Sequence, residues 1–164
     1  MDAAAAFRAH HRALCRYLYR FTGDTELVAD AVQETFVRFM DRPPRAGSER
    51  AWLFRVATNL VREAGRTRSR RWQILLAAGG RVPVGDPPPH ADEALEQAER
   101  RRRVQHALLE LSPRERIALL MREEGFAHRE IAEAVGTTTG SVGTLIARAL
   151  DKLAPRLDLD QEDL

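Results

Sequence analysis

Apolar residues recur every three to four positions along almost the whole chain, which predicts α-helices and leaves few candidate strands. Three such stretches fill the first half of the sequence. The first carries Phe7, Leu14, Leu18 and Phe21 and ends near residues 22–23. The second spans residues 24–40, and a segment with two prolines and a glycine over residues 42–47 ends it. Ser48 is the expected N-cap of the third, whose inward face is expected to hold Trp52, Leu53, Val56, Leu60 and Val61.

The second half contains a strong helix start and the pattern of a helix-turn-helix. Ser112, Pro113 and Glu115 stand where an N-cap, a first-turn proline and the far residue of a capping box are expected, and a helix from about residue 93 precedes them. A short helix over residues 129–135 is followed by Gly136 and three threonines. The last helix carries apolar residues at helical spacing, namely Val142, Leu145, Ile146, Ala149, Leu150 and Leu153.

Residues 79–92 have no repeating apolar face. They hold three glycines and three consecutive prolines, which predicts an extended linker. The sequence therefore predicts an all-α fold of two small helical domains, residues 1–78 and 93–164, the second containing the helix-turn-helix. The chain has 164 residues. Domains of roughly 70 residues bury only about 60% of their unfolded surface, so each is expected to gain stability from a partner.

Charge is divided unevenly between the two halves. Residues 1–81 hold 15 arginines against 8 acidic residues, whereas residues 82–164 hold 10 arginines and one lysine against 16 acidic residues. Arginine binds phosphates and bases in a bidentate manner, so the basic half suggests a nucleic-acid partner, although an arginine-rich genome explains the same composition. No segment approaches the ~20 apolar residues of a membrane helix, and no signal peptide is visible. We therefore expect a cytoplasmic protein without membrane insertion.

The third predicted helix carries the most informative pattern. Five polar residues lie along one face of it, spaced 4, 3, 4 and 4 positions apart: Arg55, Asn59, Arg62, Arg66 and Arg70. This face lies opposite Val56 and Leu60. Arginines at this spacing can follow a phosphate backbone while the asparagine reads a base edge, and an ordinary solvated face gives the same pattern. Trp52 fits stacking on an unpaired base and, more commonly, core packing.

Two further surfaces are candidates for binding. The second predicted helix has an outward stripe of mixed charge with one aliphatic residue, formed by Asp30, Gln33, Glu34, Val37, Arg38 and Asp41. Such a stripe can dock on another helix, and an ordinary hydrated face looks the same. The last helix and its entry turn expose Thr139, Ser141, Thr144 and Arg148. Amides there can hold phosphate and hydroxyls can reach base edges, although helix pairs of this shape also occur as simple packing.

The sequence gives no support for catalysis, a cofactor or a metal. The motifs GxxxxGKS/T, HExxH, GxSxG and GxGxxG are absent. The five histidines are scattered without ligand spacing, and the single cysteine, Cys15, excludes an intramolecular disulfide and a multi-cysteine zinc site. We interpret Cys15 as a packed small hydrophobic residue. We expect no enzyme activity.

Five segments, taken in order, carry a family resemblance. VADAVQETF at residues 28–36 is similar to a DLVQETF-type motif, and AWLFRVATNL at residues 51–60 to a WLYRIARN segment. LSPRER at residues 111–116 and EIAE at residues 130–133 match LPxxR and EIA segments. Ser141–Val142 and Arg148–Ala149 match the ends of a TVKSRLxRA recognition helix. This order and spacing resemble bacterial RNA polymerase sigma factors of the extracytoplasmic-function (ECF) class, in the sigma-70 family, across residues 5–155.

The resemblance implies a two-domain initiation factor that binds core RNA polymerase and promoter DNA, and that is usually held by an anti-sigma protein. Its first domain binds the polymerase clamp helices and opens the minus-ten element, where Asn59 and the loop over residues 42–50 are expected to read the extruded base. Its second domain binds the minus-thirty-five element. The polymerase-binding residues expected here are Asp30, Gln33, Glu34, Val37 and Arg38. The DNA-binding residues expected here are Arg55, Asn59, Arg62, Glu63, Arg66, Arg70, Arg129, Thr139, Ser141, Thr144 and Arg148.

Three departures from the family pattern change these expectations. Ala31 replaces a usual leucine in the polymerase-binding motif, which is a mild change. Glu63 replaces a common aspartate, and its longer side chain is expected to alter base preference. Gly143, Thr144 and Leu145 stand where Lys-Ser-Arg is usual, so two basic contacts are missing. An interior glycine also costs a helix about 0.5–1 kcal/mol relative to alanine. Minus-thirty-five binding is therefore expected to be weak or unusual in sequence.

Three other functions fit parts of the sequence. A stand-alone helix-turn-helix regulator explains the second half but leaves the motif around Gln33 without a role. An enzyme acting on nucleic acid lacks a metal or nucleophile constellation. A helical adaptor without DNA contact leaves the arginine stripe unexplained. Binding to core polymerase distinguishes the sigma factor from the stand-alone regulator.

Overall fold

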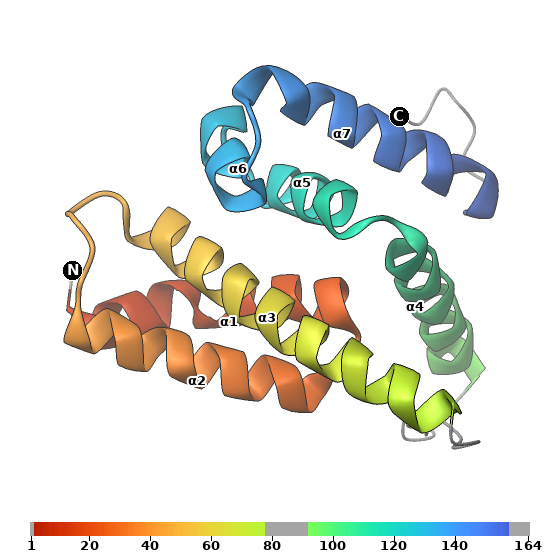
Figure 1. The fold of residues 1–164 in the computed structure, drawn as a ribbon, viewed down its shortest axis with the longest axis horizontal. Coiled ribbons are helices and arrows are strands. Elements are labelled where there is room, and N and C mark those ends of the chain that lie inside the picture. Colours follow the sequence, from red (N-terminus) through yellow and green to blue (C-terminus); the bar gives the residue numbers. More distant parts are fainter. Residues whose placement is uncertain (1, 78–91, 158–164) are drawn as a thin grey trace.

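The computed structural model describes residues 2–77 and 92–157, and within them the side chains of residues 2–66 and 97–157. Seven α-helices and one short 3-10 helix fill these ranges, with no strand in the described part (Figure 1). The predicted all-α fold is thus confirmed. Apart from Asp92, the predicted linker over residues 79–92 lies outside the described residues, as does the side chain of Arg70.

The N-terminal domain consists of three helices (Figure 1): α1 (Ala3–Thr22), α2 (Thr25–Asp41) and α3 (Glu49–Ala77). Helix α1 ends on Gly23, whose φ of 68° is a left-handed conformation that glycine adopts without strain. Asp24 then caps α2 by accepting a hydrogen bond from the amide of Leu27 at 2.9 Å. This turn folds α2 back along α1, and the three helices bury a shared core that includes Leu14, Leu18, Phe39 and Leu53.

The buried side of α3 is rotated from the one expected from the sequence. Val56 and Leu60, expected inward, are only half-buried, whereas the buried residues are Leu53, Phe54, Ala57, Thr58 and Val61. Thr58 can be buried because its hydroxyl group makes hydrogen bonds within the core. Its hydroxyl donates to the Phe54 carbonyl at 2.6 Å and, with its one hydrogen used, accepts from the Tyr17 hydroxyl at 2.8 Å. Burial raises the pKa of Tyr17, so the phenol stays a neutral donor.

The start of α3 is fixed by a turn and an aromatic contact. Ser48 occupies the expected N-cap position, and its carbonyl accepts from the amide of Trp52 at 2.9 Å. Its hydroxyl, however, donates to the carbonyl of Arg45 at 2.7 Å and so stabilises the preceding turn. Trp52 is half-buried and packs edge-on against Phe39, with 5.7 Å between ring centroids. This arrangement agrees with the core-packing interpretation of Trp52.

The C-terminal domain consists of α4 (Asp92–Glu110), α5 (Pro113–Glu123), α6 (His128–Val135), α7 (Thr139–Leu153) and the 3-10 helix η1 (Ala154–Arg156). The predicted capping box is present, since Glu115 N lies 3.3 Å from Ser112 Oγ and Ser112 N lies 2.9 Å from the Glu115 carboxylate. Lys152 Nζ, on α7, lies 2.8 Å from both carboxylate oxygens. Burial acts to raise the pKa of Glu115, but hydrogen bonds from Lys152 and Ser112 outweigh it, and the pKa is lowered.

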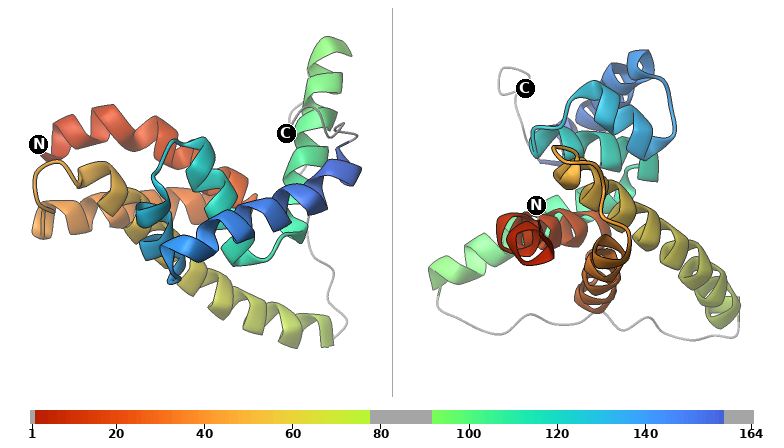
Figure 2. Two further views of the ribbon diagram at one scale, coloured as in Figure 1. Left: turned by 90° about the horizontal axis from the view of Figure 1, so that it is seen from above. Right: turned by 90° about the vertical axis from the view of Figure 1, so that its left-hand side faces the viewer.

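The two domains pack directly against each other. Helices α4 and α5 contact α1, and α6 contacts α3, so that α5 and α6 cover one side of the N-terminal helices and α7 lies beyond them (Figure 2). The first turns of α4 and the last turns of α3 extend away from this contact. The promoter-reading helix expected in the first domain thus lies beside the helix-turn-helix of the second.

Candidate nucleic-acid and protein interfaces

The outer face of α3 carries the predicted arginine stripe. Asn59 and Arg66 are exposed and Arg62 is half-buried, and neither arginine pairs with an acidic side chain among the described residues. Arg55 differs, because its Nη1 lies 3.2 Å from the Glu133 carboxylate of α6. Glu63 is exposed beside the stripe. These positions form one continuous surface whose polar groups suit a phosphate backbone and a base edge.

Helix α7, the last helix of the helix-turn-helix, presents a small, weakly basic surface. Thr139, Thr144 and Arg148 are exposed, as expected. Ser141 is half-buried rather than exposed, and its hydroxyl lies 2.8 Å from the hydroxyl of Thr138 at the helix start. Arg148 is therefore the one cation among the predicted contacts on this helix.

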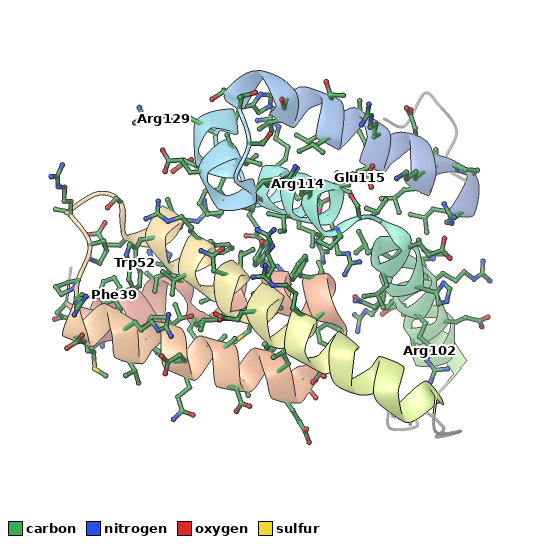
Figure 3. All side chains as sticks on the ribbon, in the orientation of Figure 1. Phe39, Trp52, Arg102, Arg114, Glu115 and Arg129 are labelled. Carbon is green, nitrogen blue, oxygen red and sulfur yellow. The ribbon has the colours of Figure 1, made fainter. Side chains whose placement is uncertain are left out.

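Two further features of the helix-turn-helix concern the predicted DNA contacts: an exposed glycine on α7 and the ion pairs of Glu133 on α6. Gly143 is exposed in the middle of α7, and no atom lies within 4 Å of the place that a Cβ would take. On α6, Arg129 points away from the body of the domain (Figure 3) and lies 3.5 Å from Glu133. Glu133 therefore contacts both Arg129 and Arg55 and links the two predicted DNA-binding surfaces.

The outward face of α2 is as predicted. Asp30, Gln33 and Val37 are exposed. Glu34 and Arg38 form an ion pair one turn apart, with 2.7 Å between Oε1 and Nε. Polar groups therefore surround one exposed aliphatic side chain, an arrangement suited to docking on a helix.

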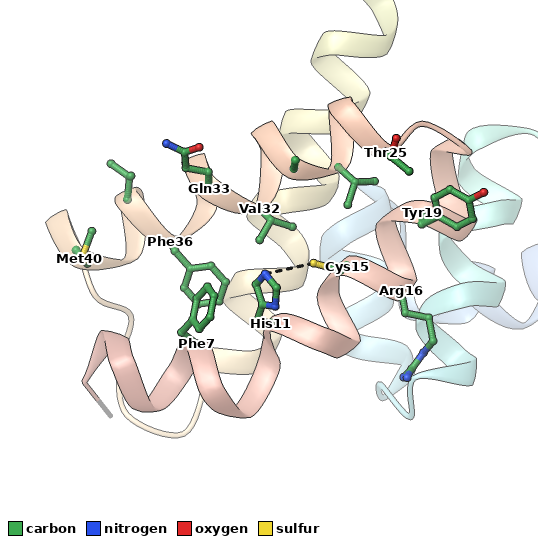
Figure 4. A pocket seen from close by; sticks show the side chains of 13 residues that line it. Phe7, His11, Cys15, Arg16, Tyr19, Thr25, Val32, Gln33, Phe36 and Met40 are labelled. Atoms are coloured by element: carbon green, nitrogen blue, oxygen red, sulfur yellow. Dashed lines mark hydrogen bonds between the residues drawn. The ribbon is translucent and has the colours of Figure 1, made fainter. Parts of the chain in front are cut away.

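An apolar groove between α1 and α2 continues this face and was not predicted from the sequence (Figure 4). Its volume is about 770 Å³, and its lining includes Phe7, Tyr19, Gln33, Phe36, Val37 and Met40. Met40 is 62% exposed, and Phe7 and Tyr19 are exposed as well. Apolar side chains gathered on a surface in this way mark a site of interaction. Sequence periodicity missed the groove because Phe7 has the spacing of a core residue.

The floor of the groove holds the single cysteine. Cys15 Sγ lies 3.5 Å from His11 Nε2, and the His11 ring stacks on Phe7 with 4.3 Å between centroids. Burial raises the pKa of the Cys15 thiol, which favours its neutral form. This agrees with the interpretation of Cys15 as a packed small residue.

The residues that the structure describes meet the requirements of neither a metal site nor a membrane-spanning helix. No three histidine, cysteine or carboxylate side chains gather there as metal ligands would. None of the described helices combines the length and hydropathy needed to cross a bilayer.

The helical fold, the α2 face and the helix-turn-helix together define a class, the sigma-70 transcription factors. The family model Sigma-70 region 2 matches residues 6–71, and Sigma-70, region 4 matches residues 101–153. Both matches coincide with the surfaces described above. The motifs identified in the sequence therefore fall within two regions of one known family.

Curated relatives identify the family within the sigma-70 class to which the chain belongs. The ECF RNA polymerase sigma factor SigL of Mycobacterium tuberculosis is 31% identical over 163 residues, covering 96% of this chain and 88% of SigL. The ECF RNA polymerase sigma factor SigE of Mycolicibacterium smegmatis is 31% identical over 150 residues, covering 89% of this chain but only 58% of SigE. The chain belongs to the ECF family of RNA polymerase sigma factors, which confirms the resemblance. The chain spans about half the length of some curated relatives that it matches.

A solved structure supports the fold. The sigma factor RpoE from Bartonella quintana, in complex with the anti-sigma factor NepR, is similar with a TM-score of 0.71, at 23% identity and 92% coverage of each chain. The two-domain helical architecture is thus that of a known sigma factor.

Proposed function

We propose that this chain is a sigma factor that binds core RNA polymerase and directs promoter-specific transcription initiation. The observation that carries the proposal is the presence of sigma-70 regions 2 and 4 in one chain, together with the exposed α2 face. We place the first domain at residues 1–78, the linker at residues 79–92 and the second domain at residues 93–164. In this function the chain needs no cofactor, catalyses no reaction and acts in the cytoplasm.

Polymerase binds, in this proposal, on the outward face of α2. Its residues are Asp30, Gln33, Glu34, Val37 and Arg38, and the apolar groove beside them takes the apolar side of the same partner helix. An amphipathic helix in such a groove uses apolar side chains as anchors and polar groups at the rim for orientation. The half-exposed ion pair of Glu34 and Arg38 is available for that role.

Promoter DNA binds on two surfaces. On α3, Asn59 reads a base of the minus-ten element, because its amide both donates and accepts hydrogen bonds. Arg62, Arg66 and Arg70 hold the phosphate backbone beside it, and Arg55 joins them when it leaves Glu133. On the second domain, α7 meets the minus-thirty-five element through Thr139, Ser141, Thr144 and Arg148, with Arg129 of α6 at the edge. The small, weakly basic surface of α7 makes this second contact weak or unusual in sequence.

An anti-sigma protein is the second protein partner in this proposal. RpoE, whose fold this chain shares, is described in complex with the anti-sigma factor NepR. A partner of that kind that covers the α1–α2 groove also excludes polymerase from the α2 face, since the groove includes Gln33 and Val37.

In vitro transcription with core polymerase on a randomised promoter library tests the proposal. A sigma factor yields transcripts whose templates share sequence at two elements. A stand-alone regulator instead binds duplex promoter DNA tightly without polymerase and yields no transcript. The expected result is polymerase-dependent selection, with poor binding of duplex DNA by the free chain.

A further inference from the structure

A pocket rich in arginine lies where the end of the last helix meets α4. Its volume is about 440 Å³, and three arginines line it, namely Arg100 and Arg103 of α4 and Arg156 of η1. The other lining residues, Val104 and Leu157, are apolar. We call these five residues the arginine pocket.

The cations at the pocket outnumber the carboxylates that neutralise them. Arg103 lies 3.8 Å from Glu99 of its own helix, and both side chains are about two-thirds exposed. Arg156 pairs with Glu110. The exposed arginines at positions 100–102 form no ion pair with any residue that the structure describes. Five neighbouring guanidinium groups therefore share two carboxylates, and an excess of three positive charges remains.

The backbone holds one wall of the pocket in place. Arg156 donates a hydrogen bond to the carbonyl of Lys152 at 2.7 Å, and the amide of Leu157 donates to the carbonyl of Leu153 at 3.1 Å. The cation of η1 is thus positioned before a ligand binds, which lowers the entropy cost of binding. On the opposite wall, Arg100 and Arg103 are three positions apart and share one face of α4. Several carboxylate or phosphate groups can bind such a site at once.

The chain itself supplies an anionic segment directly beside the pocket. Residues 158–164 read DLDQEDL, with four acidic side chains and no basic one. They lie outside the described residues, but they follow directly on Leu157, which belongs to the pocket wall. A chain of seven residues spans at most about 25 Å. The carboxylates of this segment can therefore reach the arginines of the pocket.

Tethering favours this segment over an anion that arrives from solution. A short tether gives the bound group an effective concentration in the millimolar range. An intrinsic Kd in the same range therefore fills the pocket, and a few exposed ion pairs provide affinity of that order. A nucleic acid or a second protein must reach the same concentration in solution or bind far more tightly.

We propose that the acidic segment 158–164 binds in the arginine pocket and keeps its guanidinium groups from nucleic-acid phosphates. The binding of the segment does not depend on the proposed function, whereas the benefit of shielding rests on it. A chain that searches for promoters gains from weak binding to DNA of arbitrary sequence, since every such site competes with the promoter. The segment lowers this background without contacting a base-reading residue.

Disulfide trapping in the full chain tests the contact. Val104→Cys and Gln161→Cys are introduced together in a Cys15→Ser background, and the effective concentration of the two thiols is measured against glutathione. Ala147→Cys replaces Val104→Cys in the control pair, because Ala147 is exposed on α7 and does not line the pocket. Each pair is made with the acidic segment and with a neutral one. The neutral segment carries Asp158→Asn, Asp160→Asn, Glu162→Gln and Asp163→Asn.

We expect the effective concentration of the pair at 104 and 161 to be about fivefold higher with the acidic segment than with the neutral one. This is the effect of two or three exposed ion pairs. Salt at about 1 M shortens the screening length to about 3 Å and should remove the difference. The control pair at 147 and 161 should give equal values for both segments. Equal values for the pair at 104 and 161 as well would refute the contact.

The second measurement is the affinity of the full chain for duplex DNA without promoter sequence, followed by fluorescence anisotropy over a range of salt. Each phosphate contact adds about 0.9 to the salt slope, so the neutral segment should strengthen binding and steepen the slope by about two. This gain should be largely lost when Arg100→Gln and Arg103→Gln are added. It should persist with Arg8→Gln and Arg12→Gln, a matched pair of exposed arginines on α1 without an ion pair among the described residues. The cycle separates the contact from the general rise in net charge.

The remaining outcomes distinguish the parts of the proposal. Trapping that depends on the acidic residues, with no change in DNA binding, would refute the shielding. Equal trapping, together with weaker DNA binding in the variant with Arg100→Gln and Arg103→Gln, would assign the pocket to nucleic acid and overturn the proposal. Circular dichroism checks that each variant folds. Neither measurement contains polymerase, so a chain that fails in promoter-directed transcription but shows acid-dependent trapping refutes the proposed function and supports the contact.

Discussion

Reversal of one charge on α2 gives the sharpest test of the proposed polymerase-binding face. Glu34 is 45% exposed and pairs with Arg38 on the next turn at 2.7 Å. Exposed pairs at this spacing stabilise a helix by about 0.3–0.5 kcal/mol, and the like-charge pair destabilises it by a similar amount. Glu34→Lys should therefore lower the free energy of unfolding by about 1 kcal/mol or less and leave the fold intact. Within an interface the same reversal should cost about 1–3 kcal/mol, which raises the Kd for core polymerase about 5- to 150-fold.

The assay is a titration of labelled chain with core polymerase, followed by fluorescence anisotropy. Glu99→Lys is the matched control, because Glu99 also precedes an arginine by four positions on an exposed helix surface but lies on α4. Circular dichroism and urea unfolding check the fold of both variants. If Glu34→Lys and Glu99→Lys bind polymerase equally well with intact folds, the α2 face is not the docking surface.

Three further predictions concern base reading, the core and acid stability. Asn59→Ala should remove roughly 1–3 kcal/mol of discrimination within the minus-ten element, whereas Arg66→Ala should weaken open complexes on all promoters and reduce their salt slope by about one. Transcription from a minus-ten mutant series at two salt concentrations distinguishes them, and the opposite pattern would exchange the two roles. Tyr17→Phe should lower the free energy of unfolding, measured in urea, by about 1 kcal/mol. Thr58→Val should lower it by about 2 kcal/mol, because the valine loses a second hydrogen bond and leaves the phenol unsatisfied. Equal costs for the two variants would contradict this. The lowered pKa of Glu115 means that its carboxylate stabilises the fold above the ordinary value of about 4.3. That stability disappears as pH falls through the folded pKa. Glu115→Gln should therefore destabilise by about 1 kcal/mol at neutral pH and progressively less as pH falls through the folded pKa, and an effect that does not change with pH would refute the sign.

The parts of the fold that the sequence predicted correctly depend on short-range signals. The capping box of Ser112 and Glu115 acts over three residues, and the glycines at 23 and 136 adopt left-handed conformations at helix ends. Such signals involve neighbouring backbone groups, so they can be recognised without knowing what else the chain contacts. The same is true of the exposed residues of α2, where helical spacing alone separates the outer from the inner face.

The parts that the sequence did not predict depend on contacts between distant segments. Helix α3 packs on two sides, against the N-terminal helices and against α6, so its apolar residues do not form one simple stripe. That is why Val56 and Leu60 were expected inward in place of Phe54 and Thr58. The partner of Arg55 lies 78 residues along the chain, and no local pattern indicates it. The groove between α1 and α2 likewise arises only when the two helices are brought together.

At Gly143, one substitution can improve both binding and stability, two properties that usually oppose each other in a binding site. Gains in function at binding surfaces commonly reduce stability. A glycine inside a helix already costs about 0.5–1 kcal/mol relative to alanine, and a Cβ added at position 143 would lie in open space. Replacement by lysine or arginine should thus stabilise α7 and add a cation to its exposed surface in a single step. In the proposed function, the contact of α7 with the minus-thirty-five element is therefore one substitution away from a stronger form that carries no stability penalty.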